Sequence, residues 1–136
     1  MVTRYYVDTS VAVHALMGTP RAARWFDEVT ADGETILISS RLLQTELTRA
    51  LRRDDVPVAD REAVLANVGL APVTEAILTG AEAITQHVKT LDAIHLATAL
   101  SVGSDVVVVS HDANLKRIAE MLGLSAHDPI QDAPDG

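Results

Sequence analysis

The chain has 136 residues, 48% of them hydrophobic and only 3% aromatic, which is the composition of one domain with an aliphatic core. It has no cysteine, so disulfides, zinc–thiolate sites and thiol nucleophiles are excluded, and a reducing compartment, the cytoplasm, is expected. The formal net charge of −8 argues against nucleic-acid binding unless a cation neutralises some of the acids. The sequence has no signal-peptide pattern and no apolar run of membrane-spanning length, so we expect no membrane association.

Hydrophobic patterning predicts strands that alternate with helices. The expected strands are short and mostly apolar, and they fall at 4–8, 35–38, 70–73, 105–110 and 124–127. The expected helices lie between them, at 10–17, 20–31, 40–53, 57–68, 75–88, 91–102 and 112–122. This alternation predicts an α/β fold, a three-layer α/β/α sandwich around a parallel sheet of four to five strands. We expect one folded domain over 1–127 and a flexible acidic tail over 128–136, which carries two prolines.

Two aspartates lie at the ends of predicted strands. Asp8 closes the first strand, and Asp112 follows the valine-rich strand at 105–110. Ligands of open α/β sheets bind at the carboxyl ends of the strands, where both residues fall. An acid at a strand end is also a common helix cap or turn former, and for each residue alone that interpretation stays open.

Two further acids interrupt apolar helix surfaces. Glu46 lies inside the leucine stripe of the helix at 40–53, where a carboxylate needs a partner or a proton. Asp92 opens the most apolar helix, with His95 one turn further along. An arginine-paired or neutral glutamate and a helix-dipole aspartate are the alternatives at these two positions.

Carboxylates that meet in one place repel each other and require a cation, and oxygen ligands without cysteine favour Mg²⁺ or Mn²⁺. We therefore predict a metal-binding and catalytic set made of Asp8, Glu46, Asp92 and Asp112. Hydroxyl and amide groups near the two strand ends are predicted to support it, namely Ser10, Ser110 and Asn114. Two arginines of the helix at 40–53, Arg41 and Arg49, are candidates to hold a nucleic-acid backbone, although a solvated charged face is an equally good interpretation.

Four segments occur in a familiar order: Asp8-Thr9-Ser10, then Glu46 on its helix, then Leu91-Asp92-Ala93-Ile94-His95-Leu96-Ala97, then Ser110-His111-Asp112-Ala113-Asn114-Leu115. This pattern resembles the PIN-domain nucleases over residues 5–124, and the one-domain length resembles the VapC-type toxins of bacterial toxin–antitoxin pairs. The resemblance implies Mg²⁺- or Mn²⁺-dependent cleavage of single-stranded or looped RNA by the four acids. It also implies a homodimer, a cognate antitoxin protein that blocks the site, and a first strand beside the fourth.

Other functions remain open from the sequence. A DNA or structure-specific nuclease would need insertions and basic clamps that this chain lacks. A receiver-like Mg²⁺-binding signalling domain would need an aspartate at the end of the third strand, where Val73 stands. A non-catalytic metal- or RNA-binding module is the third alternative.

Overall fold

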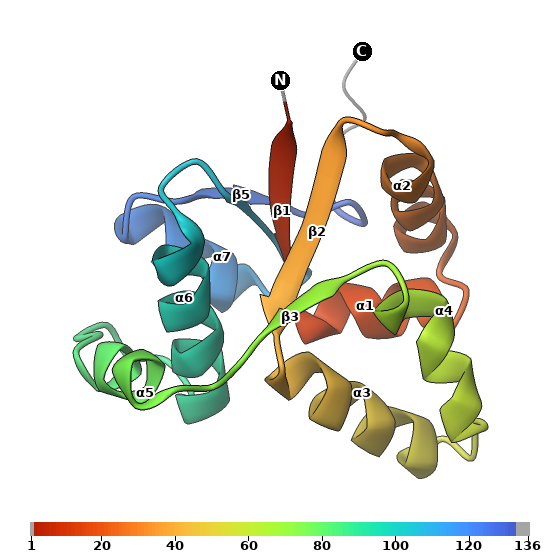
Figure 1. Ribbon diagram of the computed structural model, residues 1–136, viewed down its shortest axis with the longest axis horizontal. Helices are drawn as coiled ribbons and strands as arrows, with labels where there is room; N and C mark the ends of the chain where they lie inside the picture. The colour runs from red at the N-terminus through yellow and green to blue at the C-terminus, as the bar shows by residue number, and fades with distance from the viewer. Residues whose placement is uncertain (1, 133–136) are drawn as a thin grey trace.

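Five parallel strands form the centre of the molecule in a computed structural model that describes residues 2–132 (Figure 1). They are β1 (Thr3–Val7), β2 (Thr35–Ser40), β3 (Gly69–Ala71), β4 (Val107–Val109) and β5 (Ser125–His127). The strand order is β3-β2-β1-β4-β5, so β1 lies between β2 and β4 and the direction of winding reverses beside it. Ligand sites of open parallel sheets lie at such a reversal, beyond the carboxyl ends of the strands.

Helices cover both faces of this sheet, which confirms the predicted three-layer α/β/α architecture (Figure 1). On one face lie α1 (Thr9–Leu16), α2 (Pro20–Ala31), α3 (Leu42–Arg53) and α4 (Glu62–Leu65), with a short 3₁₀ helix, η1 (Val58–Arg61), before α4. On the other face lie α6 (Thr90–Val102) and α7 (Ala113–Met121), and α5 (Glu75–Glu82) packs against α6.

Alternating side chains of the central strands supply both cores. Val7 and Val109 point to the α1–α4 face, whereas Tyr6 and Val108 point to the α6–α7 face. This is the two-residue period of a strand applied to neighbours paired in register, since Tyr6 is opposite Val108 and Val7 is opposite Val109. The chain turns at Asp8 immediately after this pairing ends, and the register therefore places Asp8 beside Ser110.

Two of the predicted helices are wrong in extent. The helix expected over 57–68 is replaced by η1 and a single turn of α4, because the chain must already pair with β2 at Gly69. The helix expected over 75–88 ends at Glu82. The residues that follow include the β-branched Ile84, which packs in the α6–α7 core and has a lower helix propensity.

Residues 128–132, which were expected to belong to a flexible tail, are held in a turn against the domain. Asp128 is completely buried, and its Oδ1 accepts hydrogen bonds from the backbone N–H groups of Ile130 and Gln131 at 2.9 and 3.1 Å. Arg21 of α2 donates to the carbonyl of Ile130 at 2.7 Å and to that of Asp132. Proline and acid content predicted disorder, but these contacts with distant residues hold the turn at 128–132 against the domain. Residues 133–136 lie outside the described residues.

Candidate active site

Asp8 lies at the carboxyl end of β1 and is only 5% exposed. It occupies the N-cap position of α1, yet its side chain makes no capping hydrogen bond. Instead, its Oδ2 accepts hydrogen bonds from Ser10 Oγ at 2.7 Å and from Ser110 Oγ at 2.9 Å. Within the described residues, Oδ1 of Asp8 has no hydrogen-bond partner. The carboxylate is therefore fixed through one oxygen, and its second oxygen is available to a ligand.

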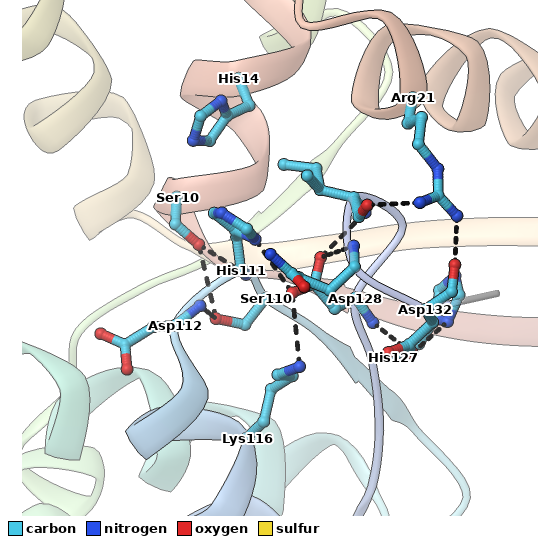
Figure 2. Close-up of polar contacts among 12 residues, drawn as sticks. Ser10, His14, Arg21, Ser110, His111, Asp112, Lys116, His127, Asp128 and Asp132 are labelled. Atoms are coloured by element: carbon cyan, nitrogen blue, oxygen red, sulfur yellow. Dashed lines mark hydrogen bonds and ion pairs between the residues drawn. The ribbon is translucent and has the colours of Figure 1, made fainter.

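Asp112 is the N-cap of α7 and does cap it, because its Oδ1 accepts from the N–H of Leu115 at 3.0 Å. Its own N–H donates to Ser110 Oγ at 3.0 Å (Figure 2). Ser110 in turn donates to Asp8, so it links the two aspartates. The capping interpretation of the sequence thus applies to Asp112 and not to Asp8. Capping uses one oxygen of Asp112, and the other makes no hydrogen bond in the described part of the chain.

Glu46 projects from α3 towards the buried imidazole of His95 on α6. Its Oε1 is 2.6 Å from His95 Nε2 and accepts from Thr9 Oγ1 at 3.0 Å. Burial would raise the pKa of Glu46, but the hydrogen bonds and charge of His95 and the hydrogen bond of Thr9 lower it below its ordinary value. Burial opposes protonation of His95, but Glu46 and the charges of Asp8 and Asp92 raise its pKa overall. Both shifts favour the charged pair, with an ionised Glu46 beside a protonated His95.

His95 is anchored in turn by Tyr6, whose hydroxyl lies 2.7 Å from its Nδ1. Both rings are almost fully buried, at 1% exposure each. Burial raises the pKa of Tyr6, so the phenol stays protonated. Glu46 could be predicted from the sequence because it is an acid within an apolar stripe. Thr9 and Tyr6, which support it, could not be predicted, since neither carries a charge or lies at a telling spacing.

Asp92 lies in the first turn of α6, and its carboxylate makes no hydrogen bond or ion pair with any residue from 2 to 132. Burial and the negative charges of Asp8, Asp112 and Glu46 raise its pKa to about 6, although His95 acts in the opposite direction. Burial is the largest cause of this shift, but charges act on a pKa only from nearby, so the contributions of the other three acids mean that the four carboxylates lie near one another. The structure therefore brings all four predicted acids into one neighbourhood.

The donor set suits a hard divalent cation, because it offers only carboxylate and hydroxyl oxygens. Among residues 2–132, Asp8, Glu46 and Asp112 each have one carboxylate oxygen without a hydrogen bond, and Asp92 carries an unfavourable charge that a cation would relieve. Across residues 2–132, however, no three His, Asp or Glu side chains are gathered tightly enough to hold a metal ion as they stand. The residues fit the cation by the chemistry of their oxygens and by the negative charge that they share.

An open pocket of about 660 Å³ lies between α1 and α3 beside these acids. Glu46, Arg49 and Arg53 line it from one face of α3, as their helical spacing requires, and Ser10 and His14 line it from α1. Of the two predicted arginines, Arg49 is part of this lining. Arg41 is not, and its guanidinium donates to Thr45 at 3.1 Å.

Asn114 is not brought into the group. It is exposed on α7, and its Oδ1 accepts from Arg117 at 2.6 Å. Because Asn114 follows Asp112 by two residues, the sequence predicted it as a further oxygen ligand. Its position on α7 directs its side chain away from the carboxyl ends of the strands. Arg53 and His14 were missed, since only the packing of α1 against α3 places them at the pocket.

The PIN domain family model matches residues 5–121 of this chain. Ribonuclease VapC35 of Mycobacterium tuberculosis is 33% identical over 136 residues, which cover 93% of this chain and 97% of that protein. None of the helices within residues 2–132 is both long and apolar enough to cross a bilayer.

Solved structures with the same fold include VapBC2 from Rickettsia felis bound to a DNA fragment from its promoter, with a TM-score of 0.72 and 12% identity over 93% of this chain and 98% of that one. A toxin–antitoxin complex from Klebsiella pneumoniae has a TM-score of 0.69 and 18% identity, over 92% and 97% of the two chains. The family model and the sequence relationship agree, and the chain belongs to the PIN domain family, among its VapC-type members.

Proposed function

We propose that this protein is a Mg²⁺- or Mn²⁺-dependent endoribonuclease, the toxin of a toxin–antitoxin pair, and that it hydrolyses phosphodiesters in single-stranded or looped RNA. One observation carries the proposal: Asp8, Glu46 and Asp112 all raise the pKa of Asp92, so four carboxylates from distant parts of the chain act on one point. Identity of 33% to a protein named as a ribonuclease supports RNA as the substrate.

The side chains that would hold the cation are Asp8, Glu46, Asp92 and Asp112. When bound, the cation would neutralise charge on the phosphodiester and lower the pKa of an attacking water. Ser10 and Ser110 orient Asp8, and Thr9 and His95 orient Glu46, through one oxygen of each carboxylate, which would leave the other oxygen for a cation. No cysteine is available, and the site requires no protein nucleophile.

Water would attack the phosphorus in line with the bond to the 3′ oxygen. The new P–O bond forms as the P–O3′ bond breaks, and the products carry a 5′-phosphate and a 3′-hydroxyl. Arg49 and Arg53, which line the pocket beside Glu46, would bind flanking phosphates. Unpaired RNA suits this site, because A-form duplexes bury their base edges in a deep, narrow groove.

The proposal includes an antitoxin protein as the partner. Solved structures that share the fold are described as a toxin–antitoxin complex and as VapBC2, which supports this assignment. We place the activity in the cytoplasm, where a chain without cysteine loses nothing to reduction. The homodimer implied by the family stays a prediction.

Cleavage of an end-labelled pool of unstructured RNAs tests the function directly. We expect products with 5′-phosphate ends in millimolar Mg²⁺ or Mn²⁺ and none in excess EDTA, because the carboxylates alone repel the phosphodiester. Cleavage that persists in EDTA would contradict the metal requirement. Binding of Mn²⁺ without cleavage of any RNA would favour the non-catalytic module instead.

Replacement of Arg49 by alanine is expected to weaken RNA binding with little effect on the chemical step. One lost phosphate contact corresponds to a rise in KM of about 5-fold to 10-fold and to a salt slope smaller by about 0.7. Arg24→Ala, which removes an exposed arginine of α2 outside the pocket, is the matched control. Steady-state kinetics at several KCl concentrations measure both quantities. Equal KM values for the two variants would remove Arg49 from the RNA path.

A further inference from the structure

The buried carboxylate of Asp128 joins the turn at 128–132 to the segment that carries Asp112. Its Oδ1 closes the turn itself, as described above. Its Oδ2 reaches outward and lies 2.9 Å from His111 Nδ1 and 3.3 Å from Lys116 Nζ (Figure 2). His111 precedes Asp112 directly, and Lys116 follows it by one turn of α7. Asp128 therefore holds the chain on both sides of a proposed metal ligand.

Asp128 is ionised in this arrangement. Burial would raise its pKa, but hydrogen bonds from His111, from the N–H groups of Ile130 and Gln131 and from Lys116 lower it below the ordinary value. An ionised carboxylate only accepts hydrogen bonds, so His111 donates from Nδ1. A charged acceptor makes these hydrogen bonds stronger and more directional than neutral ones.

The connection continues from His111 to Asp8. The backbone N–H of His111 donates to Ser10 Oγ at 3.0 Å, and Ser10 Oγ donates to Asp8 Oδ2. Ser110, which precedes His111, donates to the same oxygen of Asp8 and accepts from Asp112 N–H. A shift of His111 would therefore move the supports of Asp8 and the backbone of Asp112 together.

In Figure 2 the carboxylate of Asp112 points away from Asp128. Asp128 therefore does not ligate the same cation; it acts on the geometry of those that would. We infer that Asp128 is a positioning residue for Asp112 and Asp8, acting through His111 and Lys116. This inference rests on the proposed function and adds Asp128 alone to the side chains that support its site.

A purely structural role for Asp128 is the alternative, in which it only fastens the end of the chain to the domain. Asp132 separates the two possibilities. It belongs to the same turn, where its Oδ2 lies 3.1 Å from His127 Nδ1 and accepts from the N–H of Asp128 at 2.9 Å. Its side chain makes no hydrogen bond or ion pair with residues 110–116 of the described chain. Loss of the Asp132 carboxylate therefore loosens the turn without releasing the segment of Asp112.

The experiment compares Asp128→Asn with Asp132→Asn. Thermal-shift titration with Mn²⁺ gives the metal midpoint, and cleavage of the labelled RNA pool gives kcat and KM. For Asp128→Asn we expect a midpoint about 10-fold to 100-fold higher and a kcat lower by a similar factor, the usual cost of losing an outer support of a metal site. KM should stay unchanged, and excess Mn²⁺ should restore part of kcat. For Asp132→Asn we expect midpoint and kcat within about twofold of the parent protein.

A second pair of variants covers the case in which Asp128→Asn does not fold. His111→Ala should reproduce the raised Mn²⁺ midpoint, whereas His111→Asn, whose side-chain amide can replace Nδ1–H as a donor, should recover much of the lost affinity. Equal changes of midpoint and kcat in Asp128→Asn and Asp132→Asn, or a His111→Asn protein that binds Mn²⁺ no better than His111→Ala, would overturn the inference. A parent protein that neither binds Mn²⁺ nor cuts RNA would overturn the proposed function itself.

Discussion

Asp8→Asn is expected to abolish RNA cleavage, by at least about 100-fold in kcat, while the protein stays folded. The asparagine has the same shape, and its Oδ1 can still accept from Ser10 and Ser110, which now hold Oδ2 of Asp8. The asparagine lacks the negative charge of Asp8. Among the four acids, Asp8 is the one that is both buried and without a helix-capping hydrogen bond from its side chain. The cation would therefore lose a ligand, while the surrounding hydrogen bonds remain.

The fold should tolerate this change, because the substitution removes one of the charges that repel Asp92. Circular dichroism and the melting temperature check the fold, and cleavage of the labelled pool in Mg²⁺ and Mn²⁺ checks the activity. Asp27→Asn, at an exposed position of α2, is the matched control and should cut RNA like the parent protein. Activity equal to the parent in Asp8→Asn would exclude Asp8 from the chemistry.

Three of the four acids could be located from two kinds of local pattern in the sequence. Asp8 and Asp112 could be placed because strands of a parallel sheet bring their carboxyl ends to one edge. Glu46 could be placed because its helical position falls among leucines. These signals are properties of single elements, and the strand order β2-β1-β4, which the family resemblance implied, then brings those elements together.

The supports of the acids could not be predicted in the same way. Whether an acid caps a helix depends on its rotamer, and two N-cap positions differ here: Asp112 caps α7, whereas Asp8 does not cap α1. The Tyr6–His95–Glu46 chain joins β1, α6 and α3, and no sequence spacing encodes it. Uncharged hydroxyls such as that of Thr9 carry even less signal.

The end of the chain shows the strongest effect of tertiary contacts. Composition predicts disorder from residue 128, since the segment is acidic and rich in proline. Asp128 is nevertheless buried, because Arg21 holds its turn and His111 and Lys116 donate to its carboxylate, from distant parts of the chain. A local window of sequence contains none of those donors, so local reasoning could not find the turn.

Substitution of Asp92 is the second change with a large expected effect. We expect it to raise the stability of the metal-free protein and to abolish its function. The pKa of Asp92 in the folded protein, about 6, is higher than the ordinary value of 3.8. A group with a raised folded pKa contributes stability that is complete below pH 3.8 and is lost as the pH rises through about 6. The metal-free protein should therefore be destabilised by ionised Asp92 at pH 7 but not below pH 4.

The side chain of the Asp92→Asn variant cannot ionise, so this variant does not lose stability as the pH rises through about 6. At pH 7 without metal, we expect the variant to melt about 2–4 °C above the parent protein, a small gain because the half-exposed position is partly screened by solvent. The difference should shrink towards zero between pH 6 and pH 4, within the window set by the two pKa values. Glu120→Gln, at an exposed position of α7, is the control and should show no such pH-dependent gain.

Metal should reverse the order of the two proteins. In the parent protein, Mn²⁺ must displace the proton of Asp92 at pH 5 but finds it ionised at pH 7, so the rise in melting temperature should be small at pH 5 and large at pH 7. Asp92→Asn should show little rise at either pH and no RNA cleavage. Parallel melting curves for both proteins from pH 4 to 7, with equal responses to Mn²⁺, would show that Asp92 does not share the field of the other three acids. The raised pKa of Asp92 thus connects the instability of the metal-free site to the affinity that we expect for its cation.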